Sequence, residues 1–131
     1  MIDFRLTAYS DALLKLHDHI CPRQILGLRM GIYGADLLKV DVPQTNKRLL
    51  AFVETNGCFA DGLTVATGCS LGHRTLYLMD YGKAATTLVD TETERAIRIA
   101  PHPECRNRAI RAITDASNHW DAYLQIGRAH V

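Results

Sequence analysis

The chain has 131 residues, of which 47% are hydrophobic and 22% charged, and its formal net charge is +1. These values are typical of one globular domain with one core, and we expect a single domain over 1–131. A near-neutral charge spread along the chain gives no basis for nucleic acid or a membrane surface as a partner. The longest apolar run, Leu49 to Val53, is far shorter than the roughly 20 residues of a membrane span. The N-terminus lacks a secretory apolar region, so we expect a cytoplasmic protein with reduced cysteines.

Two helices are expected first, from Thr7 to His17 and from Pro22 to Leu38, because apolar residues recur there at helical spacing. Pro22 is well suited to the first position of a helix. Three glycines recur three and four residues apart in the second helix, namely Gly27, Gly31 and Gly34. Each costs about 1 kcal/mol relative to alanine in a helix. Close approach of another backbone would offset this cost, and either a subunit partner or a ligand could supply it.

Between these helices, His17, His19 and Cys21 stand at alternate positions. An extended backbone would point all three side chains the same way. Pro22 disfavours helical dihedrals at Cys21 and makes this cysteine the cap of the second helix. Unpaired N–H groups and the helix dipole favour a thiolate there, which predicts a metal ligand or a nucleophile. The alternative is a helix end with two solvated imidazoles and a capping thiol.

A buried strand is expected from Arg48 to Thr55, followed by a short helix from Ala60 to Thr67 that stops at Gly68. Cys58 and Cys69 flank this helix. It would separate the two cysteines by about 12 Å at 1.5 Å per residue, too far to share one ion easily. Cys58 is therefore either a ligand or a small buried apolar residue, and Cys69 either a reactive thiol or a structural one. The simpler role for Asp61, in the first turn of this helix, is to accept hydrogen bonds from unpaired N–H groups.

Three short strands are expected after Arg74, over Leu76–Met79, Ala84–Val89 and Ala96–Ile99. Their two short connections predict an antiparallel meander. The resulting fold class is α+β, with an antiparallel sheet packed against helices. A C-terminal helix is expected from Pro103 through Leu124.

Three blocks of this sequence, taken together, resemble the FmdE family of formylmethanofuran dehydrogenase components. They are H-D-H-I-C-P at 17–22, E-T-N-G-C-F-A-D-G-L-T-V-A-T-G-C-S-L-G at 54–72 and D-Y-G-K-A-A at 80–85. The resemblance implies an α+β core in an intertwined homodimer, with a metal-binding cleft built from the first two blocks. It also implies a relation to molybdenum or tungsten formylmethanofuran dehydrogenases, whose subunits would be partners. Longer members carry a C-terminal zinc-binding module with paired C-x-x-C motifs, so this chain is expected to be a core-only version.

The same resemblance assigns the site residues. His17, His19 and Cys21 match its H-x-H-x-C, and Cys58, Asp61 and Cys69 match its C-x-x-D and T-G-C. The glycine-lysine turn ends in Lys83. We therefore expect a metal bound by His17, His19, Cys21 and Cys58, and catalytic roles for Cys69, Asp61 and Lys83. Two sites depart from the family, Arg23 where glycine is usual and His73, which is either an extra ligand or a surface residue.

Sulfur and imidazole ligands favour zinc, with nickel or iron as alternatives, and exclude magnesium and calcium in practice. Two functions fit these expectations. One is a metalloprotein in a redox or one-carbon system, with Cys69 as a second thiol and Lys83 anchoring substrate, although Lys83 could equally be a solvated turn residue. The other is a metal carrier or insertion protein without turnover.

Overall fold

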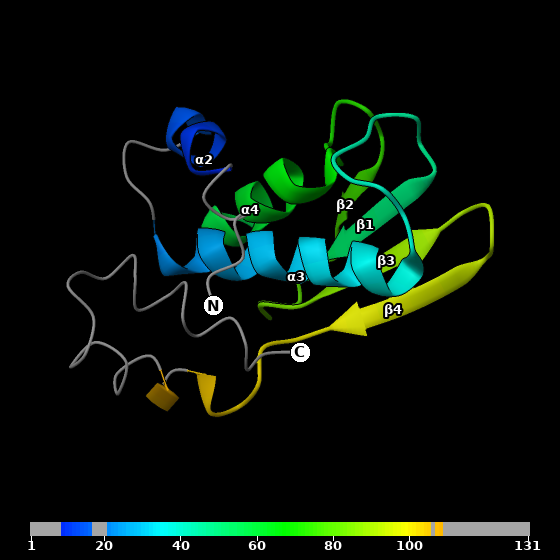
Figure 1. Ribbon diagram of the computed structural model, residues 1–131. Helices are drawn as coiled ribbons and strands as arrows, with labels where there is room; N and C mark the ends of the chain where they lie inside the picture. The colour runs from blue at the N-terminus through cyan, green and yellow to red at the C-terminus, as the bar shows by residue number, and fades with distance from the viewer. Residues whose placement is uncertain (1–8, 17–20, 106, 109–131) are drawn as a thin grey trace.

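A computed structural model describes residues 9–16, 21–105 and 107–108 of the chain (Figure 1). It contains helices α2 (Ser10–Leu16), α3 (Pro22–Leu38) and α4 (Cys58–Thr67), and strands β1 (Leu49–Val53), β2 (Leu76–Leu78), β3 (Thr86–Asp90) and β4 (Arg95–Ile99). Helices α3 and α4 lie side by side over one face of the four-stranded sheet (Figure 1). The class is α+β, as the sequence predicted. Among the described helices, none combines the length and apolar character needed to cross a membrane.

The helix boundaries follow the local signals closely. Helix α3 has the predicted bounds, and Cys21 before it has the extended φ and ψ of −110° and 158° expected next to Pro22. Helix α4 begins at Cys58, two residues earlier than predicted, and ends at Gly68, whose φ of 81° glycine adopts without steric cost. The earlier start places Cys58 in the first turn of α4. The predicted C-terminal helix lies almost wholly outside the described residues.

The sheet corrects one expectation, because it is mixed rather than antiparallel. Its strand order is β2-β1-β3-β4. Strand β1 pairs parallel with β2, where Ala51 faces Leu76, and antiparallel with β3. The predicted meander is wrong at its first connection, since β1 lies between β2 and β3, and correct for the β3–β4 hairpin. The physical reason is the crossover: α4 connects β1 to β2, and a helical crossover is the usual connection between parallel neighbours.

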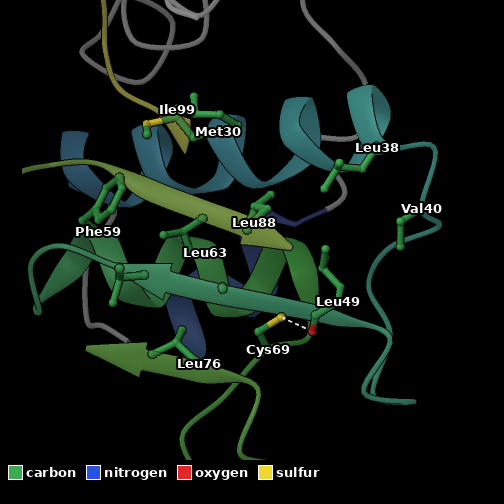
Figure 2. Packing of buried hydrophobic residues seen from close by; sticks show 12 residues of the cluster. Met30, Leu38, Val40, Leu49, Phe59, Leu63, Cys69, Leu76, Leu88 and Ile99 are labelled. Atoms are coloured by element: carbon green, nitrogen blue, oxygen red, sulfur yellow. Dashed lines mark hydrogen bonds between the residues drawn. The ribbon is translucent and has the colours of Figure 1, made fainter. Parts of the chain in front are cut away.

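The core lies between the sheet and the two long helices. Alternate residues of β1 are buried, and Leu49, Ala51 and Val53 are at most 1% exposed. Leu88 of β3 and Ile99 of β4 reach the position of Gly34 on α3, where a β-carbon would collide with both side chains. Phe59 and Leu63 from α4, together with Met30 from α3, complete this cluster (Figure 2).

The glycine spacing of α3 is explained by α4 of the same chain, rather than by the partner subunit or ligand that the sequence suggested. A β-carbon at Gly27 would collide with the Phe59 carbonyl oxygen, and one at Gly62 with the Gln24 carbonyl oxygen. Further along, a β-carbon at Gly31 would lie 2.7 Å from that of Ala66. These contacts occur in the same order along both helices. The helices therefore run in the same direction, and their N-termini lie at one end of the molecule.

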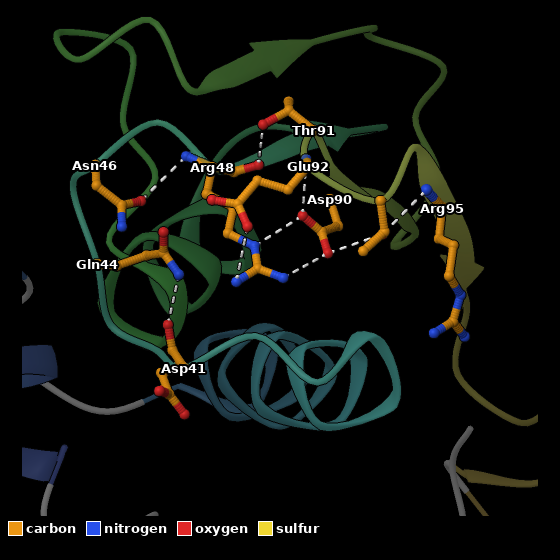
Figure 3. A network of polar contacts seen from close by, with 9 residues as sticks. Asp41, Gln44, Asn46, Arg48, Asp90, Thr91, Glu92 and Arg95 are labelled. Carbon is orange, nitrogen blue, oxygen red and sulfur yellow. Dashed lines mark hydrogen bonds and ion pairs between the residues drawn. The ribbon is translucent and has the colours of Figure 1, made fainter.

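A polar network joins the start of β1 to the β3–β4 hairpin (Figure 3). Arg48 donates from Nε and Nη2 to the two carboxylate oxygens of Asp90, both at 2.9 Å. Asp90 is fully buried, and it also accepts from the Thr93 hydroxyl at 2.9 Å and the Glu92 backbone N–H at 3.1 Å. The bond from Arg48 holds the pKa of Asp90 well below its usual range. Opposite charge and full pairing mark this cluster as structural.

Candidate functional site

Two cysteines meet where the N-termini of α3 and α4 converge. Cys21 is the cap of α3, and Cys58 is the first residue of α4. The chain reaches Cys58 from β1 through Gly57, whose φ is 82° and which has no neighbouring atom in the space of a β-carbon. Both thiols are free and only partly buried. The parallel helices thus bring together two predicted metal ligands that come from separate sequence blocks.

The thiols lie close enough to interact. The pKa of Cys58 is raised, first by the side-chain interaction with Cys21, then by burial and by the negative charges that Cys21 and Asp61 can carry. Asp61 lies one turn along α4 from Cys58. All three groups are neutral or anionic, so each additional negative charge here raises the cost of the next. A cation would reverse this balance, which makes the cluster chemically suited to a metal ion.

Gln24 supports the Cys21 end of the site from beneath. This side chain is fully buried, and its Oε1 accepts from the Cys21 backbone N–H at 2.9 Å. Since that donor requires an oxygen, the amide orientation is fixed. Its Nε2 is buried without a hydrogen-bond partner in the part of the chain that the structure describes. A buried N–H donor without a partner is uncommon and points to an acceptor that is still to be identified.

The other two predicted ligands, His17 and His19, lie outside the described residues. Within the described ranges, no group of three or more His, Cys, Asp or Glu side chains has the geometry to hold a metal ion. Cys21 and Cys58 therefore supply two ligands at most, and a complete site needs further donors from elsewhere.

Cys69 lies beyond the opposite end of α4 from Cys58, as the length of the predicted helix indicated. It is 1% exposed within the main core, and its thiol donates to the Leu49 carbonyl oxygen at 3.3 Å (Figure 2). Burial raises the pKa of Cys69. Inert structural cysteines have such surroundings, so the predicted catalytic role of Cys69 gains no support from its position. His73 lies nearby on an exposed turn, with its Nδ1 2.8 Å from the Ser70 hydroxyl.

Lys83 lies at the end of β1 instead, beside Glu54. The Lys83 backbone N–H donates to the Glu54 carbonyl oxygen at 3.1 Å. The carboxylate of Glu54 accepts from Nε and Nη2 of Arg98 at 2.8 and 2.9 Å. Arg98 and, to a smaller extent, Lys83 lower the pKa of Glu54. Sequence reasoning gave no role to Glu54 or Arg98, because their pairing crosses from β1 to β4.

Glu54 also lines an open hollow of about 280 Å³ on the sheet face away from α3 and α4, formed by Phe52, Glu54, Met79, Tyr81, Thr87 and Val89. The second and third sequence blocks meet here, through Glu54 and Lys83, whereas the first and second meet at the thiols. Both meeting points lie where β1 ends and α4 begins. Lys83 is therefore separated from the thiol pair by the intervening residues of the second block.

The sequence matches the family described as "FmdE, Molybdenum formylmethanofuran dehydrogenase operon" over residues 16–126. This range includes the thiol pair, both long helices and the whole sheet. The α+β fold and the convergent cysteines thus belong to a known class of domain. The chain belongs to the FmdE family.

Two relatives place the chain more closely. A crystal structure of an FmdE-like protein of tungsten formylmethanofuran dehydrogenase, from Syntrophus aciditrophicus, superposes with a TM-score of 0.64 at 23% identity, over 93% of this chain and 66% of that one. At this identity the likeness concerns the fold. A protein of Archaeoglobus fulgidus named "Probable S-adenosyl-L-methionine-binding protein" is 38% identical over 93 residues, which is 69% of this chain. The matched region spans 25% of that curated relative.

Proposed function

We propose that this protein is a cytoplasmic metal-binding member of the FmdE family, whose ion is held where α3 and α4 begin. Cys21 and Cys58 would supply sulfur ligands, and His17 and His19 would supply imidazole nitrogens. The observation that carries the proposal is the contact between the Cys21 and Cys58 side chains, with Asp61 adding negative charge. Family membership supports a link to formylmethanofuran dehydrogenase and thus to redox or one-carbon chemistry.

Zinc fits this donor set best, with nickel or iron as alternatives, because thiolate and imidazole are its common ligands. An ion bound by three protein ligands would keep a position open for substrate and act as a Lewis acid. Of the chain's own groups, Asp61 would add negative charge beside the ion. The amide N–H of Gln24 would donate to an electron-rich sulfur or to a bound ligand. Any role of Lys83 or Cys69 in a reaction would be exerted away from the ion.

The direct test is the metal content of Cys21→Ala. We expect elemental analysis to find bound metal in the natural protein and none in this variant. Cys105→Ala is the matched control, since Cys105 lies beyond β4 and belongs to no sequence block. Unchanged metal stoichiometry in Cys21→Ala, with circular dichroism showing a folded chain, would contradict the proposed site.

A second candidate is a metal carrier that binds and passes on the ion without turnover. The partial exposure of both thiols favours this candidate, because exchange requires that an acceptor reach the ligands. A carrier is expected to lose its metal to a competing chelator within minutes while it stays folded, whereas an enzyme site would retain it. A chelator-coupled absorbance assay, followed by circular dichroism, separates the two.

We also propose that the protein forms a homodimer and that it associates with subunits of a molybdenum or tungsten dehydrogenase. The support is the operon association in the family description, together with exposed apolar residues around β2, among them Tyr77, Leu78 and Met79. Sedimentation equilibrium is expected to give twice the chain mass. A monomer at micromolar concentration would contradict the homodimer.

A further inference from the structure

The cysteine pair has a second chemical capability that does not require a metal. Cys21 and Cys58 begin two different helices, and backbone contacts next to them fix the helix positions. A β-carbon at Gly27 would strike the carbonyl of Phe59, the residue after Cys58. One at Gly62 would strike the carbonyl of Gln24, three residues after Cys21. The two sulfur atoms therefore cannot move far apart without separation of the helix backbones.

We propose that Cys21 and Cys58 form a reversible disulfide that joins the N-termini of α3 and α4 and excludes metal from the site. The oxidant is a small disulfide, such as oxidised glutathione. One cysteine thiolate attacks a sulfur of this disulfide and forms a mixed disulfide, and one thiol of the oxidant leaves. The second cysteine then loses its proton and attacks the protein sulfur of the mixed disulfide, and the second thiol leaves. In total, two protein thiols become one disulfide while one small disulfide becomes two thiols.

Three observations favour this pair over any other pair of the four cysteines. The side chains of Cys21 and Cys58 interact directly. Both are partly exposed, so a small oxidant can reach them. Cys69, by contrast, is buried beyond the far end of α4 and donates to the Leu49 carbonyl. The convergence of the helix N-termini also favours the attacking thiolate, because both helix dipoles point their positive ends at these sulfurs.

Exclusion of metal is the part that rests on the proposed function. A sulfur in a disulfide has no thiolate charge to offer, so oxidation removes two of the four proposed ligands at once. The two histidines alone would bind zinc far more weakly. The site would then hold its ion only under reducing conditions, and the redox state of the cell would control metal loading.

The test uses the full chain, freed of metal with a chelator, incubated with oxidised glutathione, and then alkylated, digested and analysed by mass spectrometry. We expect one dominant cross-linked peptide that joins Cys21 to Cys58. Cys105→Ser is expected to give the same cross-link. Cys58→Ser and Cys21→Ser are expected to give none and to carry glutathione on the remaining cysteine of the pair. Glutathione on both cysteines of the unmodified chain, or a cross-link to another cysteine, would overturn the proposal.

A second measurement separates this inference from the proposed function. Zinc binding is measured by titration with the reduced and the oxidised chain. We expect at least a hundredfold weaker binding after oxidation, reversed by a dithiol reductant. Equal zinc affinity of the two forms would overturn exclusion of metal. Formation of the cross-link in a chain that binds no zinc when reduced would refute the proposed metal site and leave the disulfide established.

Discussion

Two clusters of ionisable side chains lie in different parts of this molecule and differ in how their members are paired. At the start of β1, Arg48 and Asp90 carry opposite charges and are joined by two hydrogen bonds of 2.9 Å. At the start of α3 and α4, Cys21, Cys58 and Asp61 are all neutral or negative, and their proximity raises the pKa of Cys58. The first cluster is complete within the chain, whereas the second would gain stability from an added cation.

The comparison shows why ionisable residues cannot be assigned a role by residue type alone. Glu54 lies in a sequence block shared with the family, beside an open hollow, yet Arg98 pairs with its carboxylate through two hydrogen bonds. Opposite charges in such geometry satisfy each other. Like groups held together by the backbone need an external partner. The thiol end is thus the stronger candidate for chemistry.

The largest expected effect comes from the backbone contact that holds the thiol end together. Gly27→Ala places a methyl group against the Phe59 carbonyl oxygen, and we expect a loss of about 3 kcal/mol in the free energy of unfolding, as overpacking against a rigid backbone can cost. Gly72→Ala is the matched control, because no atom lies within 4 Å of its added carbon; there we expect a change within about 0.5 kcal/mol. Chemical denaturation measures both. Equal stabilities would contradict the close contact between α3 and α4.

The next largest effect concerns the complete cluster. Asp90→Asn removes the charge that Arg48 binds, so we expect a lower melting temperature at neutral pH. Metal content should not change, because Asp90 lies far along the sheet from the thiols. The exposed Asp80 provides a control, Asp80→Asn, with a melting temperature close to that of the natural chain.

The pH dependence of the same variant gives a sharper test. The pKa of Asp90 is lower in the folded chain than the usual value of about 4, so the folded state binds this proton less readily than the unfolded state does. The stabilisation is therefore fully present above about pH 5 and is lost as the pH falls below about 4. The melting temperatures of Asp90→Asn and the natural chain should converge in acid. A difference that stays constant down to about pH 2 would contradict the ion pair.

The smallest effect tests the incomplete cluster in the metal-free protein. Asp61→Asn removes a negative charge near Cys58, so the pKa of Cys58 should fall towards its ordinary value. Cys21→Ala removes the largest cause of the shift and should lower that pKa further. Titration of the thiolate by ultraviolet absorbance, with Cys105→Ala in the background to reduce overlap, measures the order of the variants. A rise in either variant would show that the three groups are not neighbours.

The sequence predicted most local structure and one essential feature of the site. Proline at position 22 made Cys21 a helix cap, and the left-handed conformation available to glycine placed the end of α4 at Gly68. These signals involve contacts within a few residues, which is why they can be read from the chain alone. The family resemblance was confirmed over residues 16–126.

Long-range pairing could not be predicted in the same way. The parallel pairing of β1 with β2 was missed because short apolar strands carry no label for their neighbours, although the strand–helix–strand order of β1, α4 and β2 was an available signal. The pairing of Glu54 with Arg98 was missed because it joins residues 44 positions apart. The roles of His17 and His19 remain predictions, since they lie outside the described residues.

The sequence by itself determined where the two long helices begin and end, and it placed a cysteine at the start of each. Local dihedral preferences of proline and glycine decide such boundaries. Only the tertiary structure decided that the helices run side by side in the same direction, because this depends on glycine contacts such as that of Gly27 with Phe59, between residues distant in the chain. That arrangement turns two separate cysteines into a pair.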